Sequence, residues 1–185
     1  MAEQKPNVIL IFCDDLGYGD LGCFGSEVNK TPRLDQMAAE GMRFTDFYSA
    51  ASVCTPRRAA LMTGCYPERV GRLGVLFPRD KIGLNPSEMT IAELVKQKDY
   101  ATAIYGKWHL GHNNTKWHPN NQGFTHFHGH YNGAIDYFDL TREGERDWHV
   151  NETASDEQGY STDLIASAAS RFIAKHAKGA APYLC

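Results

Sequence analysis

The chain has 185 residues, and 19 Lys and Arg stand against 22 Asp and Glu, for a formal net charge of −3. That length supports one domain with a sizeable core. The charge argues against a nucleic-acid-binding protein, which needs a strong basic excess. No apolar run approaches the roughly 20 residues that span a bilayer, so we expect no membrane partner. The first residues, MAEQKPN, contain no apolar signal segment. We therefore expect a cytoplasmic protein, or a periplasmic or secreted one whose export signal has been removed.

The first part of the chain alternates predicted strands with predicted helices. The β-branched run 7–12 (NVILIF) predicts a parallel strand covered on both faces. Thr31-Pro32 predicts a helix start and Gly41 its end, and Leu34, Met37 and Ala38 lie on one face. Residues 43–48 are predicted to form a second strand. Residues 56–62 are predicted to form a short helix that ends at Gly64.

The second part continues this alternation around a long irregular stretch. Thr90 and Glu93 form a capping-box pattern that predicts a helix with Ile91, Leu94 and Val95 facing inward. Residues 100–105 predict a strand followed at once by Gly106. Residues 111–159 are rich in Gly, Asn, His and aromatics and show little periodicity. Ser161 or Thr162 is then expected to cap a helix whose apolar positions are Leu164, Ile165, Ala168, Phe172 and Ile173.

The order of these elements predicts an α/β fold with a mostly parallel sheet sandwiched by helices. A last predicted strand begins at Pro182, and the chain stops at Cys185 without a turn after it. We therefore expect a domain that is truncated at its C-terminus, with residues 1–185 forming one incomplete domain.

Two adjacent carboxylates, Asp14 and Asp15, follow the first predicted strand directly. In open α/β sheets, ligands bind beyond the carboxyl ends of the strands. Adjacent carboxylates repel unless a cation or hydrogen-bond donors compensate them, and hard cations such as Ca²⁺ or Mg²⁺ prefer oxygen ligands. The alternative interpretation is a solvated turn, because Asp-Asp is common before Gly in loops.

The segment Cys54-Thr55-Pro56-Arg57-Arg58 places a thiol close to the start of a predicted helix. Backbone N–H groups and the helix dipole favour anions there. Arg58 shares a face with Cys54 if the helix begins that early. A nucleophile beside an arginine suits an anionic ester; the alternative is a buried thiol with a surface basic pair.

Lys107 and His109 follow the strand predicted at 100–105 and point the same way if the segment is extended. Lysine supplies positive charge for an anion, and histidine moves protons near neutral pH. The alternating histidines 126, 128 and 130 suggest a transition-metal site, although a loop packed with aromatics is the preferred interpretation.

The chain has five cysteines, an odd number, and their irregular spacing fits no disulfide framework. We expect Cys13, Cys23, Cys65 and Cys185 to be small apolar fillers rather than functional thiols.

Five segments in order resemble the sulfatase family of the alkaline-phosphatase-like superfamily. They are PNVILIFCDDLGYGDLGCFG, KTPRLDQMAAEGMRFTDFY, SVCTPRRAALMTGCYPERVG, GKWHLG and NQGFTHFHGHYNGAIDYF. The third is similar to the sulfatase signature, and the last is similar to a stretch found in arylsulfatases and hexosamine-sulfate sulfatases. The resemblance runs nearly end to end and implies an alkaline-phosphatase-like fold.

The resemblance also implies roles for individual residues. Asp14 and Asp15, with the group derived from Cys54, are implied ligands of a divalent cation, usually Ca²⁺ and alternatively Mg²⁺. A formylglycine-generating maturation enzyme is the implied partner that oxidises Cys54 to formylglycine, whose hydrate attacks the sulfur of a sulfated small molecule or glycan. Arg58 and Lys107 are implied to stabilise the sulfate oxygens and the hydrate. His109 is implied to hydrogen-bond the hydrate and assist its breakdown.

The sequence departs from the family pattern at two positions and at its end. Arg57 stands where the family has Ser or Ala, and Cys65 stands where it commonly has Arg. The later family segment, which supplies a further histidine, an Asp with Asn or Gln, and a lysine, has no counterpart here. Residues 1–185 are therefore expected to be the N-terminal part of a sulfatase catalytic domain, and this isolated chain is expected to be inactive.

Two alternatives to a sulfuric ester hydrolase stay open at this point. One is a phosphomonoester or phosphonate hydrolase of the same superfamily, which acts on an ester of similar shape and different charge. The other is a non-catalytic sulfatase-like fragment, which Arg57 and the missing later segment favour.

Overall fold

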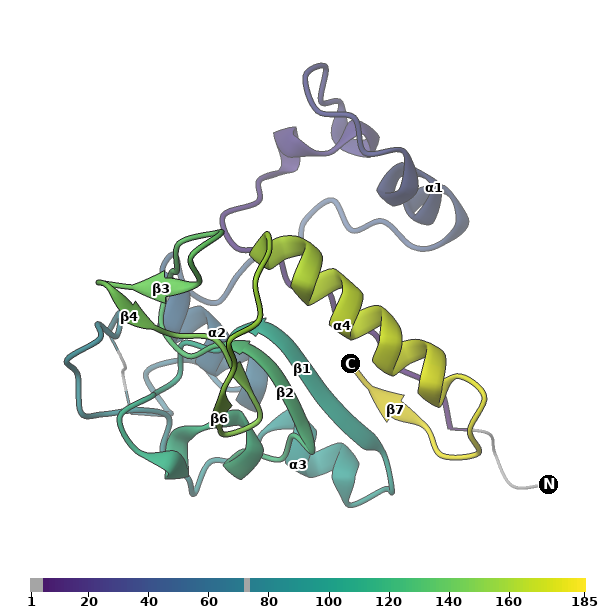
Figure 1. Cartoon of the computed structure of the whole chain (residues 1–185). Helices are drawn as coiled ribbons and strands as arrows, with labels where there is room; N and C mark the ends of the chain where they lie inside the picture. The colour runs from purple at the N-terminus through teal and green to yellow at the C-terminus, as the bar shows by residue number, and fades with distance from the viewer. Residues whose placement is uncertain (1–4, 72–73) are drawn as a thin grey trace. The chain divides into compact units, whose positions relative to one another are not determined.

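The computed structural model describes residues 5–71 and 74–185 (Figure 1). The chain divides into two compact units. The larger unit contains the described parts of residues 1–10 and 50–185, and the smaller unit contains residues 11–49. The two units are described separately below.

The larger unit is built on a five-stranded sheet with the order β6-β5-β2-β1-β7. The central strand β1 (Ala101–Lys107) runs parallel to both of its neighbours, β2 (His126–His130) and β7 (Tyr183–Leu184). The short strands β5 (His149–Val150) and β6 (Thr153–Ala154) add to the other edge in antiparallel orientation. The sheet is therefore mixed, with the predicted parallel pairing at its centre.

Helices cover both faces of this sheet, as the alternation of side chains along β1 requires (Figure 1). Ala101, Ala103 and Tyr105 belong to the cluster that packs against Phe172 of α4 (Ser161–His176). Ile104 and the neighbouring Tyr100 contact the second cluster, which contains residues of α2 (Cys54–Thr63) and α3 (Ile91–Lys96). The predicted helix–sheet–helix sandwich is confirmed.

The stretch 111–159 contains more regular structure than its composition predicts. It holds the 3₁₀ turns η3 (Thr115–Trp117) and η4 (Pro119–Asn121), then β2, and then the hairpin of β3 (Thr141–Arg142) and β4 (Glu145–Arg146), before β5 and β6. Strand β2 has the sequence HFHGH, which carries one large apolar residue. The strand pattern was hidden because histidine occupies the positions that usually hold aliphatic side chains.

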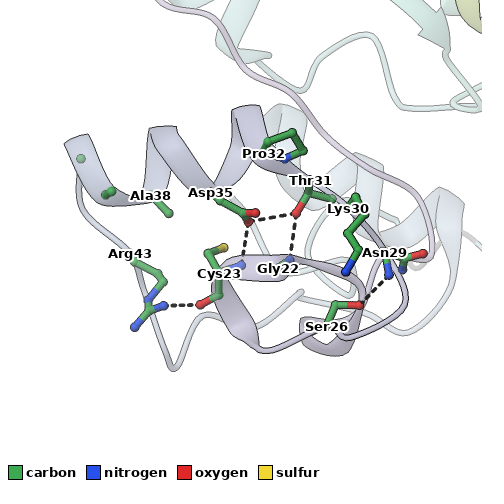
Figure 2. Close-up of a pocket in the computed structure, with 12 residues that line it drawn as sticks. Gly22, Cys23, Ser26, Asn29, Lys30, Thr31, Pro32, Asp35, Ala38 and Arg43 are labelled. Carbon is green, nitrogen blue, oxygen red and sulfur yellow. Dashed lines mark hydrogen bonds between the residues drawn. The ribbon is translucent and has the colours of Figure 1, made fainter.

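The smaller unit consists of two 3₁₀ turns, η1 (Tyr18–Asp20) and η2 (Gly22–Phe24), and the helix α1 (Pro32–Glu40). Thr31 and Asp35 connect α1 to η2. Thr31 Oγ1 accepts the Gly22 N–H at 2.8 Å, and Asp35 accepts the Cys23 N–H at 2.7 Å (Figure 2). An open pocket of about 850 Å³ lies along these residues, and none of the predicted site residues lines it.

Two predicted strands are corrected by the structure. In the run 7–12, Val8 bridges Leu184 in parallel orientation, but Ile9 is 50% and Leu10 42% exposed. Residues 8–10 pair with the chain at 183–185, whereas α3 and α4 pack against the central strand β1, so the parallel pairing is confirmed and the expected cover on both faces is wrong.

Residues 43–48 form no strand. Their aromatic side chains, Phe44, Phe47 and Tyr48, are exposed. The Phe47 N–H donates to the hydroxyl of Tyr18 at 3.1 Å rather than to a neighbouring strand.

The helix predictions hold with shifted ends. α1 has the predicted bounds, yet it buries no residue, and Met37 is exposed. α2 begins at Cys54, two residues before the predicted start. α3 has the predicted capping box, but its buried residue is Ala92, and Leu94 is exposed. The predicted hydroxyl cap of α4 is wrong, since Tyr160 is the N-cap and makes no side-chain capping bond. Among the described residues, every helix is too short or too polar to cross a lipid bilayer.

Candidate functional site

The thiol of Cys54 lies at the first residue of α2, a ten-residue helix. Val53 precedes it in an extended conformation, and Thr55 and Pro56 are buried, so the helix start is held by packing. Cys54 itself is half-buried and forms no disulfide. The prediction that it lies at a helix N-terminus is confirmed. Its side chain therefore lies where unpaired backbone N–H groups favour an anion.

Arg58 lies one turn further along α2 and connects this helix to the end of the central strand. Its Nη1 donates a hydrogen bond to the backbone carbonyl of Lys107 at 2.6 Å. Lys107 is the last residue of β1, and its neighbour in the parallel register is His130, the last residue of β2. One bond thus brings together the helix that begins at Cys54 and the strand end that carries Lys107.

His109 is buried, with 2% of its surface exposed, two residues beyond the end of β1. Its Nε2 lies 2.7 Å from the carbonyl oxygen of Leu76. A carbonyl only accepts, so Nε2 carries the proton and the lone pair of the neutral ring is on Nδ1. The backbone of His109 is left-handed, with φ of 59°. The expectation of a simple extended segment from Lys107 to His109 is therefore wrong.

The strands β1 and β2 approach each other closely one residue before their ends. A Cβ atom at Gly129 would overlap the carbonyl oxygen of Gly106, which is its partner in the parallel register. Gly106 has φ of 93°, a conformation that glycine adopts without strain. The two glycines lie directly before Lys107 and His130, so the strand ends that carry these side chains lie close together.

His130 is a buried histidine at this strand end that sequence reasoning did not assign to the site. Its Nδ1 donates to the carbonyl oxygen of Asn132 at 2.9 Å. Burial lowers the pKa of His130 to about 4; the charge of Asp147 and the bond to Asn132 oppose this shift, and the positive charges of Lys107 and Arg58 add to it. The imidazole is therefore neutral at physiological pH. The sequence did not identify it, because its place opposite Lys107 depends on the pairing of β1 with β2, a strand that the sequence did not predict.

Asp147 is a second group missed in the sequence, and it lies just after β4. Only 4% of its surface is exposed, and both carboxylate oxygens accept hydrogen bonds. Burial acts to raise its pKa, but bonds from His149, Tyr131 and Asn132 outweigh that effect and lower the pKa to about 2. Asp147 is therefore ionised, and its sequence context of one acid in a polar loop gave no signal.

The alternating histidines of β2 do not gather around a metal. His128 Nε2 lies 2.7 Å from a carboxylate oxygen of Glu157, and His130 bonds to Asn132. No group of three or more His, Cys, Asp or Glu residues with metal-binding geometry occurs in the part of the chain that the structure describes. The preferred interpretation is wrong about the loop, because these residues form a strand, but right about the packing, because His126 and His128 contact the rings of Tyr105 and Trp148.

Asp14 and Asp15 belong to the smaller unit and lie in a turn before η1. Asp15 has a left-handed backbone with φ of 55°. Two adjacent carboxylates fit the oxygen preference of a hard divalent cation, which takes six to eight ligands in the case of Ca²⁺. Two carboxylates are too few for a complete ligand set, and the role of Asp14 and Asp15 as metal ligands stays a prediction.

The other cysteines fit the expected role of apolar filler in part. Cys65 and Cys185 are half-buried and pack against the two core clusters of the larger unit. Cys23 is half-buried in the smaller unit, but Cys13 is exposed, which contradicts its predicted role. Arg57, the residue that departs from the signature, is half-buried in α2 rather than fully exposed.

Comparisons with known proteins place this geometry in a family. The Sulfatase family model matches residues 6–183. Human arylsulfatase A is 53% identical over 130 residues, which are 69% of this chain and 26% of the relative. Mouse steryl-sulfatase is 53% identical over 116 residues, 60% of this chain and 19% of the relative. The chain thus spans about a quarter of the length of the curated relatives it matches.

Solved structures agree with the sequence matches. The complex of Ps i-CgsB with k-i-k-neocarrahexaose superposes with a TM-score of 0.90 at 34% identity, covering 98% of this chain and 44% of that chain. BT4656 in complex with its substrate D-glucosamine-2-N,6-O-disulfate superposes with a TM-score of 0.77 at 28% identity, covering 97% and 33%. The predicted alkaline-phosphatase-like α/β fold is confirmed, and the chain belongs to the sulfatase family.

Proposed function

We propose that the protein carrying this chain is a sulfuric ester hydrolase, acting on the sulfate ester of an aryl alcohol or a carbohydrate. The observation that carries the proposal is the hydrogen bond from Arg58 to the carbonyl of Lys107, which joins the helix starting at Cys54 to the strand end bearing Lys107. A thiol-derived nucleophile, a helix N-terminus and two cations suit an anionic ester. Membership of the sulfatase family supports sulfate as that anion.

We propose the following division of work among the residues of the larger unit. Formylglycine made from Cys54 by a maturation enzyme would supply the nucleophilic hydroxyl at the start of α2. Arg58, oriented by its bond to Lys107 O, would direct its positive charge toward the sulfate oxygens. The Lys107 ammonium adds a second positive charge at the same strand end. His109, whose ring is oriented by the bond from Nε2 to Leu76 O, would hydrogen-bond the hydrate and assist its breakdown.

The proposed cofactor is a divalent cation, Ca²⁺ or Mg²⁺, held by Asp14, Asp15 and the oxygen that replaces the Cys54 thiol. The oxygen donors of the two carboxylates fit such a cation. When bound, it would favour the ionised nucleophile and offset the negative charge of the ester.

Sulfated carbohydrates are the proposed substrate class within this reaction. Two similar structures contain carbohydrate ligands, a neocarrahexaose in one and D-glucosamine-2-N,6-O-disulfate in the other. One curated relative is named arylsulfatase A, so we propose simple aryl sulfates as assay substrates.

The test is turnover of an aryl sulfate and of the matched aryl phosphate by the natural protein and its cysteine variants. Cys54→Ala is expected to abolish sulfate hydrolysis, whereas Cys23→Ala and Cys65→Ala keep it, since neither thiol lies at the start of α2. Mass spectrometry of the Cys54 peptide should show loss of the elements of H₂S and gain of an oxygen atom.

Three outcomes would contradict the proposal. Hydrolysis of the phosphate in preference to the sulfate would favour the phosphoesterase alternative. Unmodified Cys54 together with no turnover would favour a non-catalytic protein. Full activity of Cys54→Ala would remove Cys54 from the mechanism.

A further inference from the structure

The loop after β2 lies against the imidazole of His109. The His109 N–H donates to the carbonyl of Tyr131 at 3.0 Å. A Cβ atom built on Gly133 would lie 2.5 Å from Cε1 and 2.7 Å from Nε2 of His109. The backbone at Gly133 therefore fills the space beside the ring, and the ring lies between this loop and the carbonyl of Leu76, 2.7 Å from Nε2.

One buried carboxylate holds that loop. Asp147 accepts the Tyr131 N–H at 3.0 Å with one oxygen, and the Asn132 N–H at 2.8 Å with the other. The Asn132 side-chain amide donates to the second oxygen at 2.9 Å, and His149 Nε2 lies 3.2 Å from the first. Hydrogen bonds to a buried ionised carboxylate are stronger than neutral ones and fix geometry.

His109 needs such support because its backbone is left-handed. A non-glycine residue at φ of 59° is in a sparsely populated conformation that the surrounding structure must impose. The bond to Tyr131 O is one of the contacts that impose it, and Tyr131 is in turn bonded to Asp147. The orientation of the imidazole thus depends on a chain of contacts that ends at Asp147.

We propose that Asp147 is a positioning residue for His109, acting through the segment Tyr131–Gly133. This inference rests on the proposed function, because it assumes that His109 takes part in sulfate ester hydrolysis. In the proposed reaction, Asp147 contacts neither the nucleophile nor the sulfate ester. It determines where the His109 ring lies, and His149 and Asn132 complete the set of donors that keeps the Asp147 carboxylate in place.

The chain offers a matched control in Asp136. Its carboxylate also accepts two backbone N–H groups, from Phe138 and Asp139, each at 2.8 Å, but both on one oxygen of an exposed side chain. Asp147→Asn and Asp136→Asn therefore remove the same kind of interaction from two places. Gly133→Ala is a second probe: its backbone has no positive φ, so the added methyl group acts mainly on the His109 ring.

The experiment compares these variants in the natural protein by steady-state kinetics on an aryl sulfate and by nitrogen-15 NMR of labelled histidine, with His109 assigned from a His109→Gln sample. Asp147→Asn is expected to lower kcat ~10- to 100-fold, as misplacement of a catalytic group does, with KM changed less than about twofold. The ring nitrogen signals of His109 should shift. Gly133→Ala should give the same signature, and Asp136→Asn should leave kcat and the signals unchanged.

Failure of this inference differs from failure of the proposed function. If the natural protein hydrolyses no sulfate ester, the function is wrong, and the NMR signals of His109 still report on positioning. If His109 signals and kcat are unchanged in Gly133→Ala and in folded Asp147→Asn, the positioning role is wrong while the sulfatase activity stands. Should Asp147→Asn fail to fold, Asn132→Ala decides, because it removes one donor to the Asp147 carboxylate and leaves that carboxylate in place.

Discussion

The protonation of His130 illustrates how one buried side chain links the site to pH. Burial lowers its pKa to about 4, below the ordinary value of 6.5. In the unfolded chain the ring binds a proton below about pH 6.5, while in the folded chain it stays neutral down to about pH 4. Between these limits the unfolded state binds more protons, so the folded state loses stability as the pH falls.

We expect the free energy of unfolding of the wild type to fall by about 3 kcal/mol more than that of His130→Gln between pH 6.5 and 4. Urea unfolding at a series of pH values measures this slope. His126→Gln is the matched control on the same strand: His126 is half-buried with a lowered pKa, and its loss should remove a smaller part of the slope. A slope that is identical in wild type and His130→Gln would show that His130 is not held neutral.

At the same scale, the site residues differ in how much their sequence context revealed. Cys54, Arg58, Lys107 and His109 were predicted because they stand in motifs, and the structure brings Arg58 and Lys107 into contact. The structural role of Asp147 was not visible, because its partners are backbone groups 15 and 16 residues away whose position depends on β2. The predicted roles of Asp14 and Asp15 remain predictions.

The helix α3 shows how a short element depends on its first residue. Thr90 Oγ1 accepts the Glu93 N–H at 3.2 Å and donates to the carbonyl of Gln122 at 2.8 Å, and Glu93 returns a bond to the Thr90 N–H. A six-residue helix has too few internal bonds to be stable by itself. The capping box and the bond to Gln122 therefore stabilise both α3 and the turn that precedes β2.

Thr90→Ala should lower the free energy of unfolding by about 1–3 kcal/mol, because it removes the cap and leaves the buried carbonyl of Gln122 without this donor. Thermal or urea unfolding measures the loss. Thr90→Ser keeps the hydroxyl and is the matched control, for which a change below about 1 kcal/mol is expected. Equal destabilisation by Ala and Ser would mean that the methyl group, not the cap, is responsible.

Elements were predictable where local signals and burial agree. The capping box, the Pro and Gly at the ends of α1, and the strand that became β1 were all visible in the sequence. β2 was missed because its histidines are accommodated by tertiary partners such as Glu157 and Asn132. Residues 43–48 were assigned wrongly because aromatic content favours a strand, whereas pairing with another strand is decided by the rest of the molecule.

At the scale of the whole molecule, the two units differ in how much they bury. The larger unit contains two clusters of buried side chains on the two faces of its sheet. In the smaller unit, every described residue is half-buried or exposed, and α1 buries none of its nine residues. The smaller unit is stabilised by hydrogen bonds, such as those that Asp35 and Thr31 accept, rather than by a buried apolar core.

Amide hydrogen exchange should therefore separate the two units. The amides of α1 are expected to exchange at least ~100-fold faster than those of α4, a helix that packs Ala168 and Phe172 into the sheet. Exchange followed by mass spectrometry or NMR resolves both helices within one sample, so α4 is the internal control. Equal protection of α1 and α4 would show that burial does not govern the local stability of the smaller unit.

The pairing of Val8 with the last strand has a consequence for biosynthesis. The Val8 N–H donates to the carbonyl of Tyr183 at 2.8 Å, and the Cys185 N–H donates to the carbonyl of Val8 at 2.9 Å. Val8 thus obtains these backbone partners only after the ribosome has added a further 175 residues, up to Tyr183. At about 5–20 residues per second, this apolar segment waits on the order of ten seconds or more. During that interval its apolar side chains and unpaired backbone groups are exposed, which favours aggregation of the nascent chain.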